Sequence, residues 1–258
     1  MKLEGKVAIV TGGSRGIGAC IARRYGREGA AVAVVGNTRR DRAEAVVAEI
    51  EAAGGKAQAF LADIGVVADC ERLAREVIAA FGTVDILVNS AGIFTPLPIE
   101  EVTEENWDAQ HALNLKGAFF LTKAVVPTMK AKGAGKIINI SSIAGCGGFP
   151  NSSAYCATKG GLTNMTKALC LELAGDGINV NTLSPGNIET DMNAAFRADA
   201  DTTRGKRSSR RPGSATWTRS SSPAPRSSSP PPIRTRSTVW TSWWITAGPP
   251  GSGEGAPR

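Results

Sequence analysis

Short apolar runs alternate with longer amphipathic stretches from the amino terminus to about Thr203. Apolar runs of this length predict buried strands, and apolar positions about three to four residues apart predict helices. The predicted strands are Val7–Val10, Val32–Val35, Ala57–Leu61, Ile86–Val88, Lys136–Ile140 and Ile178–Asn181. The predicted helices are Ile17–Glu28, Arg40–Ala53, Ala68–Phe81, Thr103–Lys132 (broken once) and Ser153–Ala174. Glycines typical of helix C-caps stand at or just after the helix ends: Gly29, Gly54, Gly55, Gly82, Gly133 and Gly175.

Strands that alternate strictly with helices indicate an α/β fold. Strands that are apolar throughout are typical of a parallel sheet covered by helices on both faces. Because crossovers between parallel strands are right-handed, we expect a Rossmann-type doubly wound parallel sheet. Residues 1–203 should form it as a single domain of three layers, α/β/α.

Residues 204–258 differ from this body in composition and in charge. They hold nine Pro, twelve Ser and four of the five Trp, and no helical or strand period continues there. The net charge of +7 divides into −2 for residues 1–203 and +9 for residues 204–258. At face value these residues form a disordered basic tail. The body itself predicts neither a nucleic-acid nor a membrane partner.

The same residues also fit a coding sequence translated out of frame. In the frame that starts at the third base of each codon, Trp240–Thr241 encodes Asp and Trp243–Trp244 encodes Val. Read in this frame, the segment near the end encodes Val-Asp-(Asn/His/Tyr)-Gly. The codons upstream of it encode mostly small and apolar residues. This composition is typical of an apolar helix followed by a strand, so we expect a frameshift roughly between Asp201 and Arg211.

The cysteines and the single histidine indicate which kinds of catalytic or metal site this chain can hold. Five cysteines stand at unpaired spacings: Cys20, Cys70, Cys146, Cys156 and Cys170. This usage favours reduced thiols in a cytoplasmic protein. His111 is the only histidine and is expected to be structural, so neither a histidine-based triad nor a metal site is predicted. We expect no signal peptide, and no run of about 18 apolar residues predicts a membrane span.

A glycine-rich loop, Thr11–Gly18, lies between the first predicted strand and the first predicted helix. Glycine at 12, 16 and 18 lets the backbone turn tightly and approach a pyrophosphate, whose charge sits at the positive helix end. The strand before and the helix after are the context that a dinucleotide-binding loop requires. The alternative is a simple turn between strand and helix.

The end of the second strand, Val35–Arg39, indicates which dinucleotide is preferred. An acidic residue there would hydrogen-bond the adenosine ribose and repel a 2′-phosphate, and this segment has none. Arg15 and Arg39, or Arg40, are placed to bind that phosphate. We therefore expect NADP(H), with NAD(H) as the alternative, unless these arginines are ordinary solvated charges.

Two further strand ends are expected to face the cofactor. Asp63 follows the third strand and can accept a hydrogen bond from the adenine amino group. Asn89–Gly92 closes the fourth strand with small residues, against whose backbone a cofactor can lie. Both fall at carboxyl ends of strands, where open α/β sheets bind ligands. The alternative for each is a solvent-facing turn.

The candidate catalytic residues are Ser142, Tyr155 and Lys159. Tyr155 and Lys159 are four residues apart on one predicted helix and therefore share a face. A nearby ammonium and the charge of an oxidised nicotinamide favour the phenolate, and a fall of about three units in its pKa needs roughly 4 kcal/mol. Ser142, just after the fifth strand, can hydrogen-bond a substrate oxygen as charge develops on it. The set predicts carbonyl reduction, whereas the Tyr/Lys pair alone would more often be a surface pair.

Together these motifs resemble the short-chain dehydrogenases/reductases over about residues 3–202. The matching positions are Thr11–Gly18, Asp63, Asn89–Gly92, Asn114, Ser142, Tyr155, Lys159 and Ser184–Thr190. The resemblance implies hydride transfer between nicotinamide and a carbonyl or alcohol carbon. It also implies that residues 1–203 are a catalytic and dinucleotide-binding domain, which assembles as a homotetramer or homodimer.

The resemblance further implies individual roles. Tyr155 would be the acid/base, and Ser142 would orient the substrate oxygen. Lys159 would lower the pKa of Tyr155 and bind the nicotinamide ribose, while Asn114 would hold a water that links Lys159 to solvent. The implied cofactor contacts are Gly12, Ser14, Arg15, Gly16, Ile17, Gly18, Asn37, Arg39, Asp63, Ile64, Asn89, Ala91, Gly92, Tyr155, Lys159, Pro185, Gly186, Ile188 and Thr190.

The chain departs from the family pattern at two places. Family members commonly have Asn-Asn-Ala-Gly where this chain has Asn89–Gly92. Ser90 replaces the second Asn, which is a mild change. Beyond Thr190, family members continue with a substrate-covering segment, a helix and a last strand ending in Val-Asp-Gly-Gly. This chain matches that pattern only in the shifted frame, so the printed tail would lack the strand and part of the lid and subunit interface.

Two functions from different classes are open. The first is an NAD(P)-dependent oxidoreductase for a small secondary alcohol or ketone of sugar, polyol, hydroxy-acid, alicyclic or 3-oxoacyl type. Residues near Ile93–Pro98, Ala144–Asn151 and after Met192 would choose among these. Family members that reduce acyl-carrier-protein substrates tend to have basic residues on the helix that here reads Leu171–Leu173, so the resemblance disfavours such a substrate. The second is a catalytically silent nucleotide-binding protein whose basic tail contacts RNA or DNA. The intact Ser/Tyr/Lys set favours the first.

Overall fold

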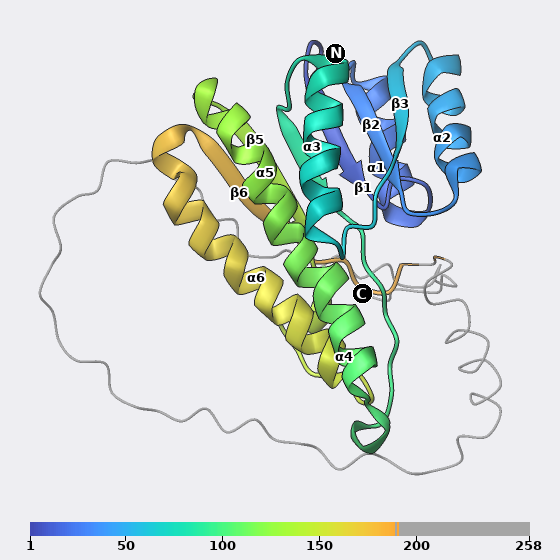
Figure 1. Ribbon diagram of the computed structural model, residues 1–258, viewed down its shortest axis with the longest axis vertical. Coiled ribbons are helices and arrows are strands. Elements are labelled where there is room, and N and C mark those ends of the chain that lie inside the picture. The colour runs from blue at the N-terminus through green and yellow to red at the C-terminus, as the bar shows by residue number, and fades with distance from the viewer. Residues whose placement is uncertain (189, 191–258) are drawn as a thin grey trace, which may run out of the picture.

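The computed structural model describes residues 1–188 and 190, which form a three-layer α/β/α fold (Figure 1). One parallel sheet contains β1 (Val7–Thr11), β2 (Ala31–Gly36), β3 (Lys56–Leu61), β4 (Ile86–Asn89), β5 (Gly135–Ile140) and β6 (Ile178–Leu183). The α-helices are α1 (Gly16–Arg27), α2 (Arg40–Ala52), α3 (Val67–Phe81), α4 (Glu104–His111), α5 (Gly117–Ala131) and α6 (Ser153–Leu173). The predicted fold class and all the predicted strands are therefore confirmed.

The sheet is doubly wound. Its strand order is β3-β2-β1-β4-β5-β6, and every neighbouring pair is parallel. The chain runs outward from β1 to β3, then returns to the other side of β1 to place β4. Ligands bind where the strand order reverses in such sheets, outside the carboxyl ends of the strands. The expected site is therefore the end of β1 and β4, which carries Gly12 and Gly92.

The core has two halves, one on each face of the sheet. Neighbouring residues of β1 point to opposite faces, so Ile9 packs toward α3, α5 and α6, whereas Val10 packs toward α1 and α2. Figure 1 shows α3, α5 and α6 side by side along the sheet. Ile9 and Val10 are both fully buried, and burying one such side chain stabilises the fold by about 1.5–3 kcal/mol. Burial on both faces explains why the strands are apolar throughout.

Two details of the predicted elements were wrong. Thr103–Lys132 is not broken, because a π-helical segment, Ala112–Lys116, joins α4 directly to α5. A π-turn shifts the phase of the apolar positions without ending the helix. Gly175 lies in a 3-10 turn, and Gly177 takes the left-handed conformation instead, with φ of 71°.

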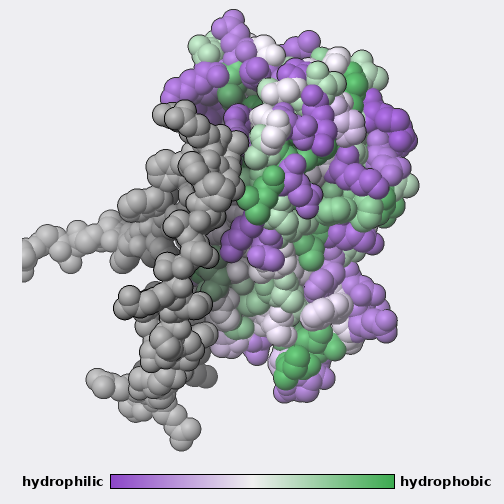
Figure 2. Space-filling view, turned by 90° about the vertical axis from the view of Figure 1, so that its left-hand side faces the viewer, coloured by the Kyte–Doolittle hydropathy of each residue, from purple (hydrophilic) through white to green (hydrophobic). Residues whose placement is uncertain are grey.

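The remaining predictions concern the cysteines, His111, membrane spans and residues 204–258. The five cysteines are free, and His111 stacks on Trp107 with ring centroids 4.0 Å apart, which is a structural role. Within residues 1–188, no helix is long and apolar enough to cross a membrane. Hydrophilic and hydrophobic residues are intermingled on the face that Figure 2 draws. The predicted tail, its shifted frame and the substrate-selecting residues after Met192 lie outside the described residues.

Candidate active site

A cavity of about 890 Å³ opens at the carboxyl ends of the strands, where their order reverses. This volume is in the range of cofactor and small-molecule sites. Most predicted site residues line it: Gly12, Ser14, Arg15, Gly16, Ile17, Gly18, Asn37, Arg39, Ile64, Ala91, Gly92, Ser142, Tyr155, Lys159, Pro185, Gly186, Ile188 and Thr190. Asp63, Asn89 and Asn114 are not among the lining residues.

The glycine loop needs its glycines for two physical reasons. Gly12 and Gly16 have φ of 62° and 54°, a conformation that other residues rarely adopt. A Cβ at Gly18 would lie 2.3 Å from the Gly12 carbonyl oxygen, so only glycine lets α1 start this close to the loop. Arg15, the N-cap of α1, makes no side-chain cap bond. The positive end of α1 therefore faces the cavity without a side-chain cap, as an anion site requires.

The cavity is positively charged at the end of β2. Arg15, Arg39 and Arg42 line it, and no Asp or Glu does so among the described residues. Arg39 also pairs with Asp41 at 2.6 Å, and this guanidinium lowers the pKa of Asp41 to about 2. Arg40, the alternative to Arg39, pairs with Glu44 outside the cavity. Sequence reasoning missed Arg42, although its position three residues after Arg39 puts the two on neighbouring parts of one helix surface.

Asp63 follows β3, as predicted, and its carboxylate makes a hydrogen bond within its own loop. Its side chain is exposed, and its Oδ1 accepts a hydrogen bond from the Gly65 N–H at 2.9 Å. The neighbouring residues Ala62 and Ile64 are the ones that line the cavity. Asp63 thus shapes the loop between β3 and α3, and an adenine contact stays a prediction.

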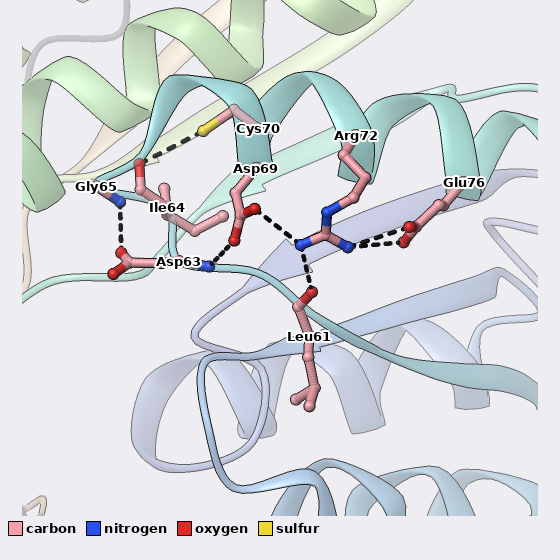
Figure 3. A network of polar contacts seen from close by, with 8 residues as sticks. All are labelled: Leu61, Asp63, Ile64, Gly65, Asp69, Cys70, Arg72 and Glu76. Carbon is pink, nitrogen blue, oxygen red and sulfur yellow. Dashed lines mark hydrogen bonds and ion pairs between the residues drawn. The ribbon is translucent and has the colours of Figure 1, made fainter.

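An ion-pair network behind this loop fixes its position (Figure 3). The Asp63 N–H donates to the carboxylate of Asp69 at 2.8 Å, and Arg72 contacts that carboxylate at 3.0 Å. Arg72 also donates to the Leu61 carbonyl at 3.1 Å and pairs with Glu76 at 3.0 Å. One guanidinium therefore ties the end of β3 to the first turns of α3.

The same loop packs against the start of α5. A Cβ at Gly117 would lie only 1.9 Å from the Ile64 carbonyl oxygen, so a larger residue cannot be accommodated without displacing the loop. The Cys70 thiol donates to the same carbonyl at 3.4 Å. The cavity wall at Ile64 is thus in direct contact with the helix that follows Asn114.

Asn89 belongs to a buried polar chain beneath the cavity. Its Nδ2 donates to Asn139 Oδ1 at 2.8 Å and to Thr122 Oγ1 at 3.2 Å. Asn139 in turn donates to Thr166 Oγ1 at 2.9 Å. The chain joins β4, β5, α5 and α6, so Asn89 positions the elements that carry the catalytic residues.

Ser142 and Tyr155 meet in the cavity. Ser142 follows β5, accepts a hydrogen bond from the Ala144 N–H at 3.1 Å, and lowers the pKa of Tyr155 through its hydroxyl. Burial raises the pKa of Tyr155, and this effect is larger than the lowering by Ser142. The predicted lowering of the pKa is therefore not produced by the protein alone, because a phenolate would be desolvated here.

Lys159 is buried one helical turn after Tyr155. Its Nζ lies 5.7 Å from the centre of the Tyr155 ring and donates to the Ile140 carbonyl at 2.9 Å. Burial lowers the pKa of Lys159 to about 8, because it removes water from the ammonium. The group can therefore gain or lose a proton near neutral pH.

Asn114 lies in the π-helical segment and holds the chain that follows β4. The side-chain amide of Asn114 is hydrogen-bonded to both backbone groups of Ile93. Its Oδ1 accepts from the Ile93 N–H at 2.8 Å, and its Nδ2 donates to the Ile93 carbonyl at 2.9 Å. It also donates to Thr158 Oγ1 at 3.3 Å. A Cβ at Gly92 would lie 3.1 Å from Asn114 Oδ1 and 3.6 Å from Lys159 Nζ. Asn114 is thus near Lys159, and its water-holding role stays a prediction.

A family model described as short chain dehydrogenase matches residues 6–201. This chain belongs to the short-chain dehydrogenase family. The 3-oxoacyl-[acyl-carrier-protein] reductase FabG of Staphylococcus epidermidis is 42% identical over 194 residues, which cover 75% of this chain and 80% of that protein. D-threitol dehydrogenase of Mycolicibacterium smegmatis is 40% identical over 191 residues, 74% of this chain and 73% of that protein.

Solved structures agree with this assignment. A dehydrogenase/reductase from Sinorhizobium meliloti 1021 is 42% identical with a TM-score of 0.73, covering 80% of this chain and 81% of that chain. A gluconate 5-dehydrogenase from Burkholderia cenocepacia, in complex with NADP and tartrate, is 35% identical with a TM-score of 0.74, covering 79% and 80%. The predicted family and enzyme class are confirmed: the chain is an NAD(P)-dependent oxidoreductase of small alcohols and ketones.

Proposed function

We propose that this dehydrogenase prefers NADP(H) and interconverts a ketone and a secondary alcohol, with Tyr155 as the acid/base. The observation that carries the proposal is the convergence of Ser142, Tyr155 and Lys159 in the cavity that the glycine loop also lines. The arginines at the end of β2 support NADP(H), since they are suited to a 2′-phosphate. The Burkholderia neighbour, which was solved with NADP, supports the same choice.

The residues present fit a dinucleotide. A Cβ at Gly12 would lie 3.0 Å from the Ala91 Cα, so glycine keeps clear the floor on which a pyrophosphate would lie. Arg15, Arg39 and Arg42 would hold the adenosine 2′-phosphate. Lys159, at the other end of the cavity, would hold the nicotinamide ribose. When bound, NADP(H) supplies or accepts the hydride at the reacting carbon.

The protein groups then handle the proton and the oxygen. Ser142 hydrogen-bonds the substrate oxygen and stabilises the charge that develops on it. In reduction, Tyr155 gives its proton to that oxygen, and the raised pKa of the phenol keeps it protonated at neutral pH. In oxidation, Tyr155 must accept a proton, and the Lys159 ammonium together with the charge of an oxidised nicotinamide stabilises the phenolate. Asn114 keeps Ile93 and the segment beside it in place.

We also propose the domain bounds, the cellular location and the oligomeric state of this protein. Residues 1–203 would form the catalytic domain, and residues 204–258 would be a frameshift product. Free cysteines support a cytoplasmic location. Half-exposed Trp107 on α4 and Phe119 on α5 support a homotetramer or homodimer, because oligomer interfaces are rich in aromatic residues.

The substitution Tyr155→Phe tests the proposal. Turnover of a ketone with NADPH should fall by at least about 100-fold, because the acid is removed. NADPH affinity, measured by fluorescence titration, should stay within a few-fold. Tyr25→Phe is the matched control, since it removes the same hydroxyl from the only other tyrosine, on α1. Unchanged turnover in the Tyr155 variant would sink the mechanism.

A further inference from the structure

The cavity wall around the catalytic pair is formed mainly by aromatic and aliphatic side chains, and Ser141, Ser152 and Asn187 also line it. The Ser141 and Ser152 hydroxyls donate to backbone carbonyls of the protein itself. The Phe94 ring packs on the Tyr155 ring, with centroids 4.7 Å apart and planes inclined by 59°. Ile143 and Ala144 follow Ser142 directly and also line the cavity. The remaining apolar lining on these segments comes from Phe149, Pro150 and Ile188. The substrate carbon that reaches Tyr155 is therefore bordered mainly by hydrocarbon surface.

This wall is held in place by hydrogen bonds. The Ser152 hydroxyl donates to the Pro150 carbonyl at 3.0 Å, which anchors the loop that carries Phe149. The Ile143 N–H donates to the Pro185 carbonyl at 3.2 Å, which joins the segments after β5 and β6. A wall anchored this way can select substrates by shape and polarity.

Three of the four cations among the described lining residues follow strands other than β5: Arg15 follows β1, and Arg39 and Arg42 follow β2. Arg39 and Arg42 follow β2, whereas Ser142 follows β5, three strand positions away in the sheet. Neighbouring strands are about 4.8 Å apart, so the two ends are separated by roughly 14 Å. Among the described lining residues, Lys159 is the cation at the catalytic end, and its Nζ is bonded to the Ile140 carbonyl.

A carboxylate beside the reacting carbon would meet this apolar wall. Transferring an ionised carboxylate from water to such surroundings without a paired cation is strongly unfavourable. An ester or a hydrocarbon substituent carries no such cost, and its apolar surface gains about 25 cal/mol per Å² buried. The wall therefore discriminates by charge, in favour of neutral ketones.

We propose that the substrate is an uncharged ketone or secondary alcohol flanked by hydrocarbon, such as an alicyclic ketone or a 3-oxo ester, rather than a keto acid or sugar acid. Phe94 and Phe149 are its specificity-determining residues. The inference rests on the proposed function, because it assumes that chemistry occurs at Tyr155. It differs from what the name of the Burkholderia gluconate 5-dehydrogenase alone would suggest.

A matched pair of substrates tests the proposal on the full chain. Ethyl 3-oxobutanoate and 3-oxobutanoate share the reacting ketone and differ in whether the neighbouring group is charged. With NADPH, kcat/KM for the ester should exceed that for the acid by at least about tenfold, equivalent to about 1.4 kcal/mol. Phe149→Arg should reduce this ratio several-fold, since it places a cation on the wall. Phe149→Leu, the control, should preserve it. A preference for the acid, or an unchanged ratio in Phe149→Arg, would overturn the proposal.

Ligand binding separates this proposal from the proposed function. Saturation-transfer NMR with the Tyr155→Phe variant and NADPH compares the ester and the acid without turnover. If the wild-type chain reduces neither compound but the ester binds more tightly, the proposed function fails and the polarity of the wall stands. If the chain is active but the acid binds more tightly and reacts faster, the substrate class is wrong and the proposed function stands.

Discussion

At the scale of single residues, burial is the largest effect on the pKa of each of the two proposed catalytic groups that titrate, Tyr155 and Lys159. The sequence identified Tyr155, Lys159 and Ser142 because their types and spacing are specific. It could not predict the sign of the Tyr155 pKa shift, because desolvation depends on how Phe94 and the segment after β4 cover the ring. It assigned Asp63 to the adenine, which stays a prediction, and it did not show that this carboxylate also accepts a hydrogen bond from the Gly65 N–H of its own loop.

Burial of the Lys159 ammonium should lower the free energy of unfolding. Its folded pKa of about 8 lies below the unfolded value near 10.4, so the destabilisation is fully present below pH 8. It is removed as the pH rises from about 8 to 10.4. Lys159→Met should therefore raise the free energy of unfolding at pH 7, by at most about 2–3 kcal/mol, and by much less at pH 10.

Urea denaturation at both pH values measures this effect. Lys167→Met, on an exposed position of the same helix, is the control and should change stability little at either pH. An Lys159→Met variant that is less stable than the wild type at pH 7 would contradict the prediction. Turnover of that variant should be lost in either case, because the phenolate and the ribose lose their cation.

Arg42 should contribute to the choice between NADPH and NADH. A charge-assisted hydrogen bond contributes about 1.5–3 kcal/mol, so Arg42→Ala should weaken NADPH binding by roughly tenfold or more. NADH affinity should stay within about twofold. Fluorescence titration of both nucleotides measures this, with Arg40→Ala as the control outside the cavity. Equal weakening of the two nucleotides would show that Arg42 does not bind the 2′-phosphate.

At the scale of elements, the period of apolar residues predicts most of the fold. Each strand begins and ends within about two residues of its expected bounds, because a buried parallel strand leaves a distinct apolar run. The π-helical segment Ala112–Lys116 was the exception. Its phase shift resembles a helix break in the sequence, and only the hydrogen bonds of the backbone distinguish the two.

The loop between β3 and α3 gives an element-scale prediction. Arg72→Ala removes the contacts with Leu61, Asp69 and Glu76 that fix this loop. The KM for NADPH should rise several-fold while kcat stays within about twofold, because Ile64 lines the cavity but does not take part in the chemistry. Arg75→Ala, on an exposed position of α3, is the control. A fall in kcat without a change in KM would exclude this positioning role.

At the scale of the whole molecule, the two ends of one cavity perform different tasks. The end near β2 is cationic and suited to a nucleotide, and the end near β5 is mainly apolar and holds Ser142, Tyr155 and Lys159. Sequence reasoning found this division only in part. Gly12, Arg39 and Tyr155 are in motifs. Phe94 and Phe149 lie in segments that the sequence analysis assigned to substrate choice, but their place on the wall follows only from the fold.

The central claim is tested most directly by following the hydride. The full chain is incubated with ethyl 3-oxobutanoate and NADPH deuterated at the transferred position of the nicotinamide, and the alcohol product is analysed by mass spectrometry. We predict one deuterium at the carbinol carbon with the wild type and with Tyr25→Phe, and a rate lower by about 100-fold or more with Tyr155→Phe. Alcohol without deuterium, or equal rates in the wild type and Tyr155→Phe, would contradict the account.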